Sequence, residues 1–183
     1  MVRRSARAGR LRAEGGFTLI ELLAVMAILG TVLAILTSLF ASGMQHERRL
    51  TRKFSTQQES RLALDRIRRE VHCASQLSVT GGGSSVSMVL PPQCPTSGAV
   101  SVSVSYQTAN VSANRYQLTR TMNSVTSTVA DYITTANLFT YTAPSYTTLG
   151  RLHVDIPVNV YPTEGWNTWR LTDDIALRNT LRF

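Results

Sequence analysis

The side chain whose position most demands a chemical explanation is Glu21, the one charged residue in the apolar run of residues 17–40. An ionised carboxylate inside an apolar helix costs about 3 kcal/mol on membrane-insertion scales, so it needs a partner or a function. Glu21 lies near the start of the run, where the positive end of the helix dipole offsets part of that cost. In a bundle of identical helices, the natural partner of this carboxylate is the free amine of a neighbour's first residue.

Cys73 and Cys94 are the second pair of side chains that could do chemistry, either as a disulfide or as two free thiols. His72 adjoins Cys73, but neighbouring side chains on a helix diverge by about 100°, and no other residues complete a recognisable catalytic set. Outside the cytoplasm disulfides persist, and this bridge would close a loop of about 20 residues. It would stabilise the fold by roughly 3 kcal/mol in the chain-entropy model. We therefore expect a disulfide that joins Cys73 to Cys94.

Asp173 and Asp174 are adjacent carboxylates that could contribute to a calcium site. They lack the regular spacing of oxygen ligands that a calcium loop has, so capping or exposure to solvent is the expected role. Two cysteines and three histidines are too few for a conventional zinc site without carboxylates. We expect no bound metal and no cofactor. The chain also lacks a phosphate-binding loop, a nucleophile elbow and a zinc-protease motif, so we expect a protein that is not an enzyme.

The element that carries Glu21 is long enough to cross a membrane. At about 1.5 Å per residue, residues 17–40 cover the roughly 30 Å hydrocarbon core of a bilayer. The run exceeds the apolar part of a secretory signal peptide, and its two small residues, Gly15 and Gly16, come before it rather than after it. A buried core helix is the other alternative, but a soluble domain of this size has little room to enclose a helix that is apolar on all sides.

Basic residues flank the apolar run on both sides. Residues 1–16 hold five arginines and one glutamate, which is half of the net charge of +8, and they are expected to stay in the cytoplasm. The opposite flank carries Arg48, Arg49, Arg52 and Lys53, so the charge rule alone does not decide the topology. Residues 77–183 are close to neutral. This distribution does not support nucleic acid as a partner, because such domains concentrate positive charge where they meet phosphate.

Residues 45–76 predict a continuation of the same helix with one buried face. Gln45 and Thr80 bracket a stretch without Pro or Gly, and apolar residues recur mostly at spacings of three and four. Acidic and basic residues are interleaved in this stretch, and we interpret these charged side chains as a face exposed to solvent. Contact of the basic side chains with DNA or anionic headgroups is the alternative. The expected buried face comprises Leu50, Phe54, Leu64, Ile67, Val71, Ala74 and Leu77.

Residues 77–183 predict a small antiparallel sheet. Residues 80–85 form a glycine-rich flexible break, and short stretches after it alternate apolar and polar residues with a period of two. Arg120 interrupts the apolar face of one stretch, and Pro157 indicates an edge strand or a bulge. The amphipathic helix would cover the apolar face of the sheet. We therefore expect an α+β fold in which a long helical spine, membrane-spanning in its first half, packs on a small sheet domain.

Residues 16–23, with the sequence GFTLIELL, resemble the processing site of type IV prepilins and type II secretion pseudopilins, and the match extends over residues 15–30. The family implies that a prepilin peptidase cleaves between Gly16 and Phe17 and that the new Phe17 amine is N-methylated. It implies that Glu21 pairs with the N-terminal amine of an adjacent subunit. Gly15 would belong to the same processing site.

The resemblance also implies an organisation into four parts. These are a cleaved cytoplasmic leader (1–16), a transmembrane and filament-core helix (17–44), an amphipathic continuation (45–76) and an extracytoplasmic domain (77–183). Many pilins carry a Pro at the position of Ser38, within a stretch that loses helicity in the filament. Because this chain has Ser38 in place of that Pro, the sequence does not decide whether its helix loses helicity in a filament.

Residues 61–70, RLALDRIRRE, resemble the helix of minor pilins and pseudopilins of the J or W type. We therefore expect a minor pilin or pseudopilin that initiates or caps a type IV pilus-like filament. Its implied partners are other pilin subunits, the prepilin peptidase, the cytoplasmic membrane and the assembly platform. The alternatives are a filament-tip module that binds DNA, a surface or a secreted protein, and a membrane-anchored extracytoplasmic enzyme. The sequence does not choose between a pilus, a competence and a secretion system.

Overall fold

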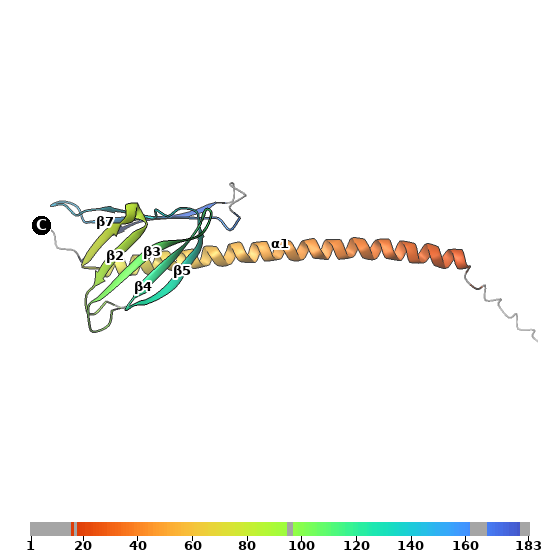
Figure 1. Ribbon diagram of the computed structural model, residues 1–183, viewed down its shortest axis with the longest axis horizontal. Coiled ribbons are helices and arrows are strands. Elements are labelled where there is room, and N and C mark those ends of the chain that lie inside the picture. Colours follow the sequence, from red (N-terminus) through yellow and green to blue (C-terminus); the bar gives the residue numbers. More distant parts are fainter. Residues whose placement is uncertain (1–15, 17, 95–96, 162–167, 180–183) are drawn as a thin grey trace, which may run out of the picture. The chain divides into compact units, whose positions relative to one another are not determined.

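The computed structural model describes residues 16, 18–94, 97–161 and 168–179. A single long helix, α1 (Leu19–Cys73), precedes the strands of an antiparallel sheet (Figure 1). The chain divides into two compact units, Met1–Arg48 and Arg49–Phe183. The expected α+β fold, a long N-terminal helix packed with an antiparallel curled sheet, is confirmed.

In the second unit, α1 buries one face against the sheet from Thr56 onward. The buried positions recur every three or four residues, and they include Leu64, Ile67 and Val71, as the sequence pattern predicted. The prediction was wrong for Leu50 and Phe54, whose residues are 67% and 72% exposed. Their spacing fits the stripe, but in the described part of the chain no strand covers them. The hydroxyl groups of the buried Thr56 and Ser60 donate to backbone carbonyls four residues earlier.

The helix ends at Cys73, three residues before its expected end, and Leu77 lies in the first strand. All strand pairs are antiparallel, in the order β1-β2-β3-β4-β5-β7-β6. β5 and β6 pair with different parts of one side of β7, and β8 pairs with the opposite side. The strands are β1 (Gln76–Thr80), β2 (Ser85–Leu90), β3 (Val102–Ser112), β4 (Arg115–Met122), β5 (Val125–Ile133), β6 (Phe139–Thr142), β7 (Arg151–Val158) and β8 (Trp169–Ala176).

The predicted period-two alternation is confirmed in the long strands. On β3, Val102, Val104 and Tyr106 are buried, while the serines between them are more exposed. On β7, every second residue from Leu152 to Val158 is buried. Together with the buried face of α1, these residues form one hydrophobic core.

Pro157 was expected at an edge or a bulge, but β7 lies inside the sheet. It pairs with β8 along one side and with β6 and β5 along the other. The Pro157 carbonyl accepts a hydrogen bond from the Thr134 N–H on the β5 side. A residue in a strand directs its nitrogen and carbonyl to the same side, so the missing N–H faces the β5 side at the point where the β5 pairing ends, next to the Ile133–Val158 pair.

The glycine-rich segment forms a defined turn rather than a flexible break. Gly81–Gly83 is a short 3-10 helix, η1, between β1 and β2. Gly83 has φ of 102°, and a Cβ atom there would lie 2.6 Å from the Phe139 carbonyl oxygen. The Leu138 N–H donates to the Gly83 carbonyl at 2.9 Å. This close approach brings the β1–β2 end of the sheet against β6, which curls the sheet.

Candidate functional site

The predicted processing site lies at the start of the described chain. Gly16 is exposed, and a Cβ atom added to it would have no neighbour within 4 Å. Gly15 and Phe17 lie outside the described residues, as does most of the leader. Cleavage after Gly16 and methylation of Phe17 therefore stay predictions from the sequence.

Glu21 caps the helix that carries it. Its carboxylate accepts hydrogen bonds from the Thr18 N–H at 3.3 Å and from the Thr18 hydroxyl at 3.2 Å, and the Thr18 hydroxyl accepts from the Glu21 N–H at 3.3 Å. This reciprocal pair is a capping box, which satisfies donors that a helix N-terminus leaves without partners. The sequence reasoning missed it, although Thr-x-x-Glu before an apolar run is its known signal. A neighbour's amine would have to share or replace these contacts.

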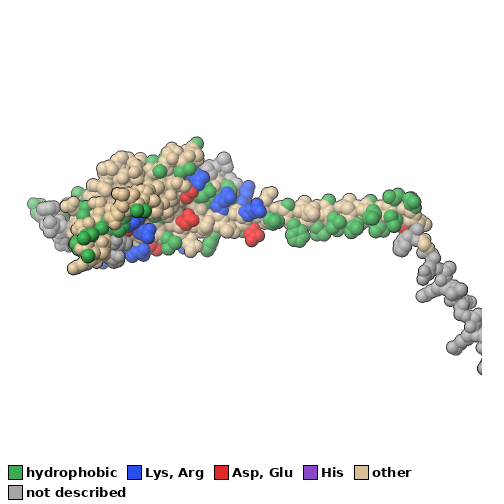
Figure 2. Space-filling model, turned by 60° about the horizontal axis from the view of Figure 1, so that its bottom comes forward, with side chains coloured by type: hydrophobic (Ala, Val, Ile, Leu, Met, Phe, Trp, Pro, Cys, Tyr) green, Lys and Arg blue, Asp and Glu red, His purple; other side chains and the backbone are tan. Residues whose placement is uncertain are grey.

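The helix after Glu21 presents an apolar surface on all sides. α1 is the one helix in the described chain that is long and apolar enough to cross a membrane, and its apolar stretch is wholly exposed in the isolated chain. The hydroxyls of Thr31, Thr37, Ser38 and Ser42 donate to carbonyls three residues earlier, so these polar groups are satisfied within the helix. Figure 2 shows the hydrophobic side chains along this stretch. The helix continues unbroken through Ser38.

A buried ion pair joins α1 to the sheet in the second unit. Glu70 is 1% exposed, and its carboxylate accepts from the Arg120 guanidinium at 2.6 Å and from the Tyr106 hydroxyl at 2.6 Å. Arg120 comes from β4 and Tyr106 from β3. The interpretation of Glu70 as part of a solvated face was therefore wrong. Arg120 interrupts the apolar face of its strand because it meets a carboxylate on the buried face of the helix.

The charges in this cluster stabilise one another. Burial alone would lower the pKa of Arg120, but the hydrogen bond and negative charge of Glu70 outweigh it and raise that pKa. Burial, and then the charge of Glu70, raise the pKa of Tyr106 well above its usual range. The phenol is therefore neutral and donates to the carboxylate. Two sequence signals could have predicted this pair: Glu70 lies on an apolar stripe of the helix, and Arg120 lies on an apolar face of a strand.

Asp173 and Asp174 do not converge on a shared site. They are consecutive on β8, so their side chains point to opposite faces of the sheet. Asp173 pairs with Arg68 of α1 at 2.8 Å, and Asp174 pairs with His153 of β7 at 2.9 Å. Among the described residues, no group of three or more His, Cys, Asp or Glu side chains is arranged to hold a metal ion.

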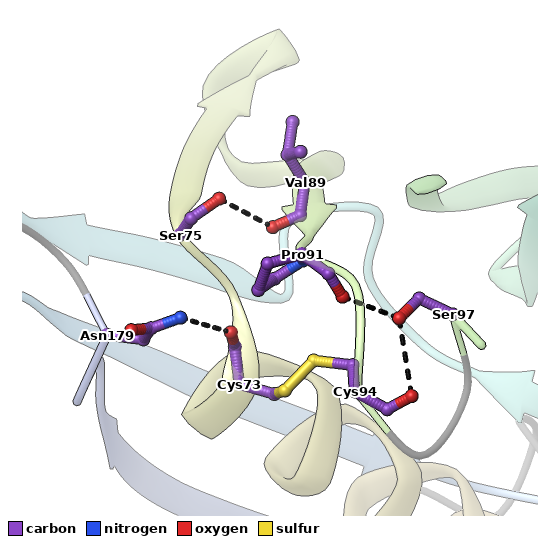
Figure 3. The surroundings of a disulfide bond; sticks show 7 residues. All are labelled: Cys73, Ser75, Val89, Pro91, Cys94, Ser97 and Asn179. Carbon is purple, nitrogen blue, oxygen red and sulfur yellow. Dashed lines mark hydrogen bonds between the residues drawn. A yellow bond between two sulfur atoms is a disulfide. The ribbon is translucent and has the colours of Figure 1, made fainter. Parts of the chain in front are cut away.

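The disulfide closes the far end of the helix (Figure 3). Cys73 ends α1, Cys94 lies in the β2–β3 loop, and the two are bonded with their Cα atoms 6.1 Å apart. Within the loop, the Ser97 hydroxyl donates to the Pro91 carbonyl at 2.6 Å. The Asn179 amide donates to the Cys73 carbonyl at 3.2 Å. The helix end, the loop and the segment after β8 therefore meet at this bond.

The comparisons with known proteins bear on the first part of the chain. Residues 11–37 match the family model described as the prokaryotic N-terminal methylation motif. The chain carries a methylation motif of the type IV pilin kind. This motif implies association with a membrane, with a prepilin peptidase and with other pilin subunits. It supports a pilin-like structural protein. No curated protein and no solved structure gives a significant match to the chain.

Proposed function

We propose that the chain is a minor pilin or pseudopilin that initiates or caps a type IV pilus-like filament after cleavage between Gly16 and Phe17. The observation that carries the proposal is the methylation motif over residues 11–37, which includes most of the exposed apolar part of α1. An apolar surface on all sides of a helix needs lipid before assembly and other apolar helices afterwards. A filament subunit passes between these two environments.

The proposed topology is a single pass through the cytoplasmic membrane, with the bulk of the chain outside the cytoplasm. The apolar part of α1 supplies the span, and the disulfide between Cys73 and Cys94 suits an oxidising compartment. From the membrane, the assembly platform would transfer the mature chain into the filament. The motif suggests a structural rather than an enzymatic protein.

The proposed minor role rests on the resemblance of residues 61–70 to minor subunits. It is tested by labelling the chain on isolated filaments with gold-conjugated antibody and by counting filaments in cells that lack it. A minor subunit that initiates or caps assembly gives label at a filament end, or sparsely along it, and its loss lowers the number of filaments. Continuous label along every filament would identify a major subunit and contradict the minor role.

A further inference from the structure

The first turns of the second unit form a surface that the filament role does not explain. We call residues 49–54 the collar; they carry three positive charges and no negative one. Arg52 is exposed, and none of the ion pairs in the described chain involves it. The Arg49 guanidinium and the Lys53 ammonium lie over the Tyr161 ring, 5.2 and 5.9 Å from its centre.

Exposed apolar groups share the collar with these charges. Leu50 and Phe54 are 67% and 72% exposed, and they lie one helical turn apart beside a hollow of about 670 Å³. Arg52 is two residues from each of them, which places it about 160° away around the helix axis. One flat protein partner cannot cover both sides of the helix. A layer that surrounds the helix can.

The position of the collar in the sequence identifies that layer. The collar follows Met44, the last apolar residue of the span, by five to ten residues, which is about 7–15 Å along a helix. The headgroups of a bilayer lie just outside its hydrocarbon core. The headgroup layer adds about 5–8 Å on each side of that core, so the collar begins at the outer edge of the layer. Long Arg and Lys side chains can reach back from there to the lipid phosphates, and Leu50, the first apolar residue of the collar, lies closest to the layer.

We propose that the collar binds the anionic headgroup surface of the membrane in which the chain is anchored, before the chain enters a filament. The exposed Arg52 supplies the attraction for phosphate, and the exposed Leu50 supplies an apolar contact with the headgroup layer. The proposal rests on the membrane anchoring that belongs to the proposed function. A protein or nucleic-acid partner at the collar is an alternative outcome of the test.

The test uses the full chain in vesicles of phosphatidylcholine with about a third phosphatidylglycerol. A benzophenone amino acid replaces the exposed Thr51, and mass spectrometry identifies what it captures on illumination. We expect phosphatidylglycerol to be captured above its mole fraction, with the excess falling as salt is added. Arg52→Glu should reduce the excess by about fivefold or more, since one basic charge near an anionic surface accounts for about that factor. The matched control, Arg66→Glu, reverses an exposed charge farther along α1 and should keep the excess.

Capture of the two lipids in proportion to their amounts would overturn the proposal, as would an equal loss in both variants. Capture of a second copy of the chain or of added DNA in place of lipid would overturn it too. Alkaline extraction of the same vesicles reports anchoring separately. If alkali extracts the chain, both the membrane anchoring and the collar proposal are contradicted. If the chain stays anchored but shows no lipid preference, only the collar proposal is contradicted.

Discussion

At the scale of single residues, Glu70 is the side chain with the largest expected effect on stability. It is fully buried, and both partners of its carboxylate come from the sheet. Removing one member of a buried ion pair leaves the other charge buried without compensation, which costs about 3–5 kcal/mol. The pair is therefore a buried polar link between the helix and the strands.

Glu70→Gln should lower the free energy of unfolding of the second unit by about 3–5 kcal/mol, because Arg120 stays charged and loses its counter-ion. The measurement is urea unfolding of the full chain in detergent, followed by near-ultraviolet circular dichroism. Glu59→Gln is the matched control, since Glu59 is exposed on the same helix, and it should change stability little. The triple variant Glu70→Met/Arg120→Met/Tyr106→Phe should recover most of the loss, because it leaves neither a buried charge nor the Tyr106 hydroxyl without a partner. Equal stability of Glu70→Gln and the control would contradict this account of the buried pair.

Asp131 makes stability depend on pH. Burial alone would raise its pKa, but the Arg115 guanidinium at 2.6 Å, the Tyr132 N–H and the Gln117 amide outweigh burial and lower the pKa below 3.8. A carboxylate whose pKa is lowered by folding stabilises the fold above its unfolded pKa, and the contribution is lost as pH falls through the folded value. The free energy of unfolding should therefore decline below about pH 4. In Asp131→Asn this decline should be shallower, and an identical decline in both proteins would contradict the assignment.

At the scale of elements, the start of α1 combines two roles for Glu21 that mutations can separate. Within the chain, Glu21 and Thr18 form the capping box, and losing such a cap costs about 1 kcal/mol. Between chains, the proposed partner of Glu21 is a neighbour's amine. Thr18→Ala removes the first contact and leaves the carboxylate in place.

Thr18→Ala should speed amide hydrogen exchange in the first turn of α1 and leave filament yield nearly unchanged. Glu21→Val should have the same local effect and also abolish or strongly reduce assembly, because a buried amine would lack its counter-ion. Both are measured as sheared filament protein per cell alongside exchange. Equal filament yields in the two variants would show that Glu21 acts through the cap and not between subunits.

The elements also show how far sequence patterns reach. The stripe from Leu64 to Ala74 was predicted because apolar spacing reflects burial where a sheet covers the helix. Leu50 and Phe54 have the same spacing but are exposed. The sequence pattern does not show where along the helix the sheet begins to cover it. Charged residues were expected to be exposed, so Glu70 was missed: its partners come from distant strands that only the tertiary fold brings to it.

At the scale of the whole molecule, the two ends of α1 serve different purposes. The N-terminal motif and the apolar stretch are local signals, so sequence alone predicted their character. The C-terminal end depends on long-range links: the disulfide between Cys73 and Cys94 and the Asn179 contact with the Cys73 carbonyl. The pairing of the cysteines could be proposed from their number, whereas the contact with Asn179 could not. These links join the helix end to the β2–β3 loop and to the segment after β8 within the second unit.

Intact-mass spectrometry of the membrane-extracted chain tests the central claim most directly, measured without and then with reduction. The account predicts loss of residues 1–16, one added methyl group on the new N-terminus at Phe17, and a gain of two hydrogens on reduction. Gly16→Ala should remain full length. A full-length, unmethylated chain in cells that have an active prepilin peptidase would contradict the filament role and leave a simple membrane-anchored protein.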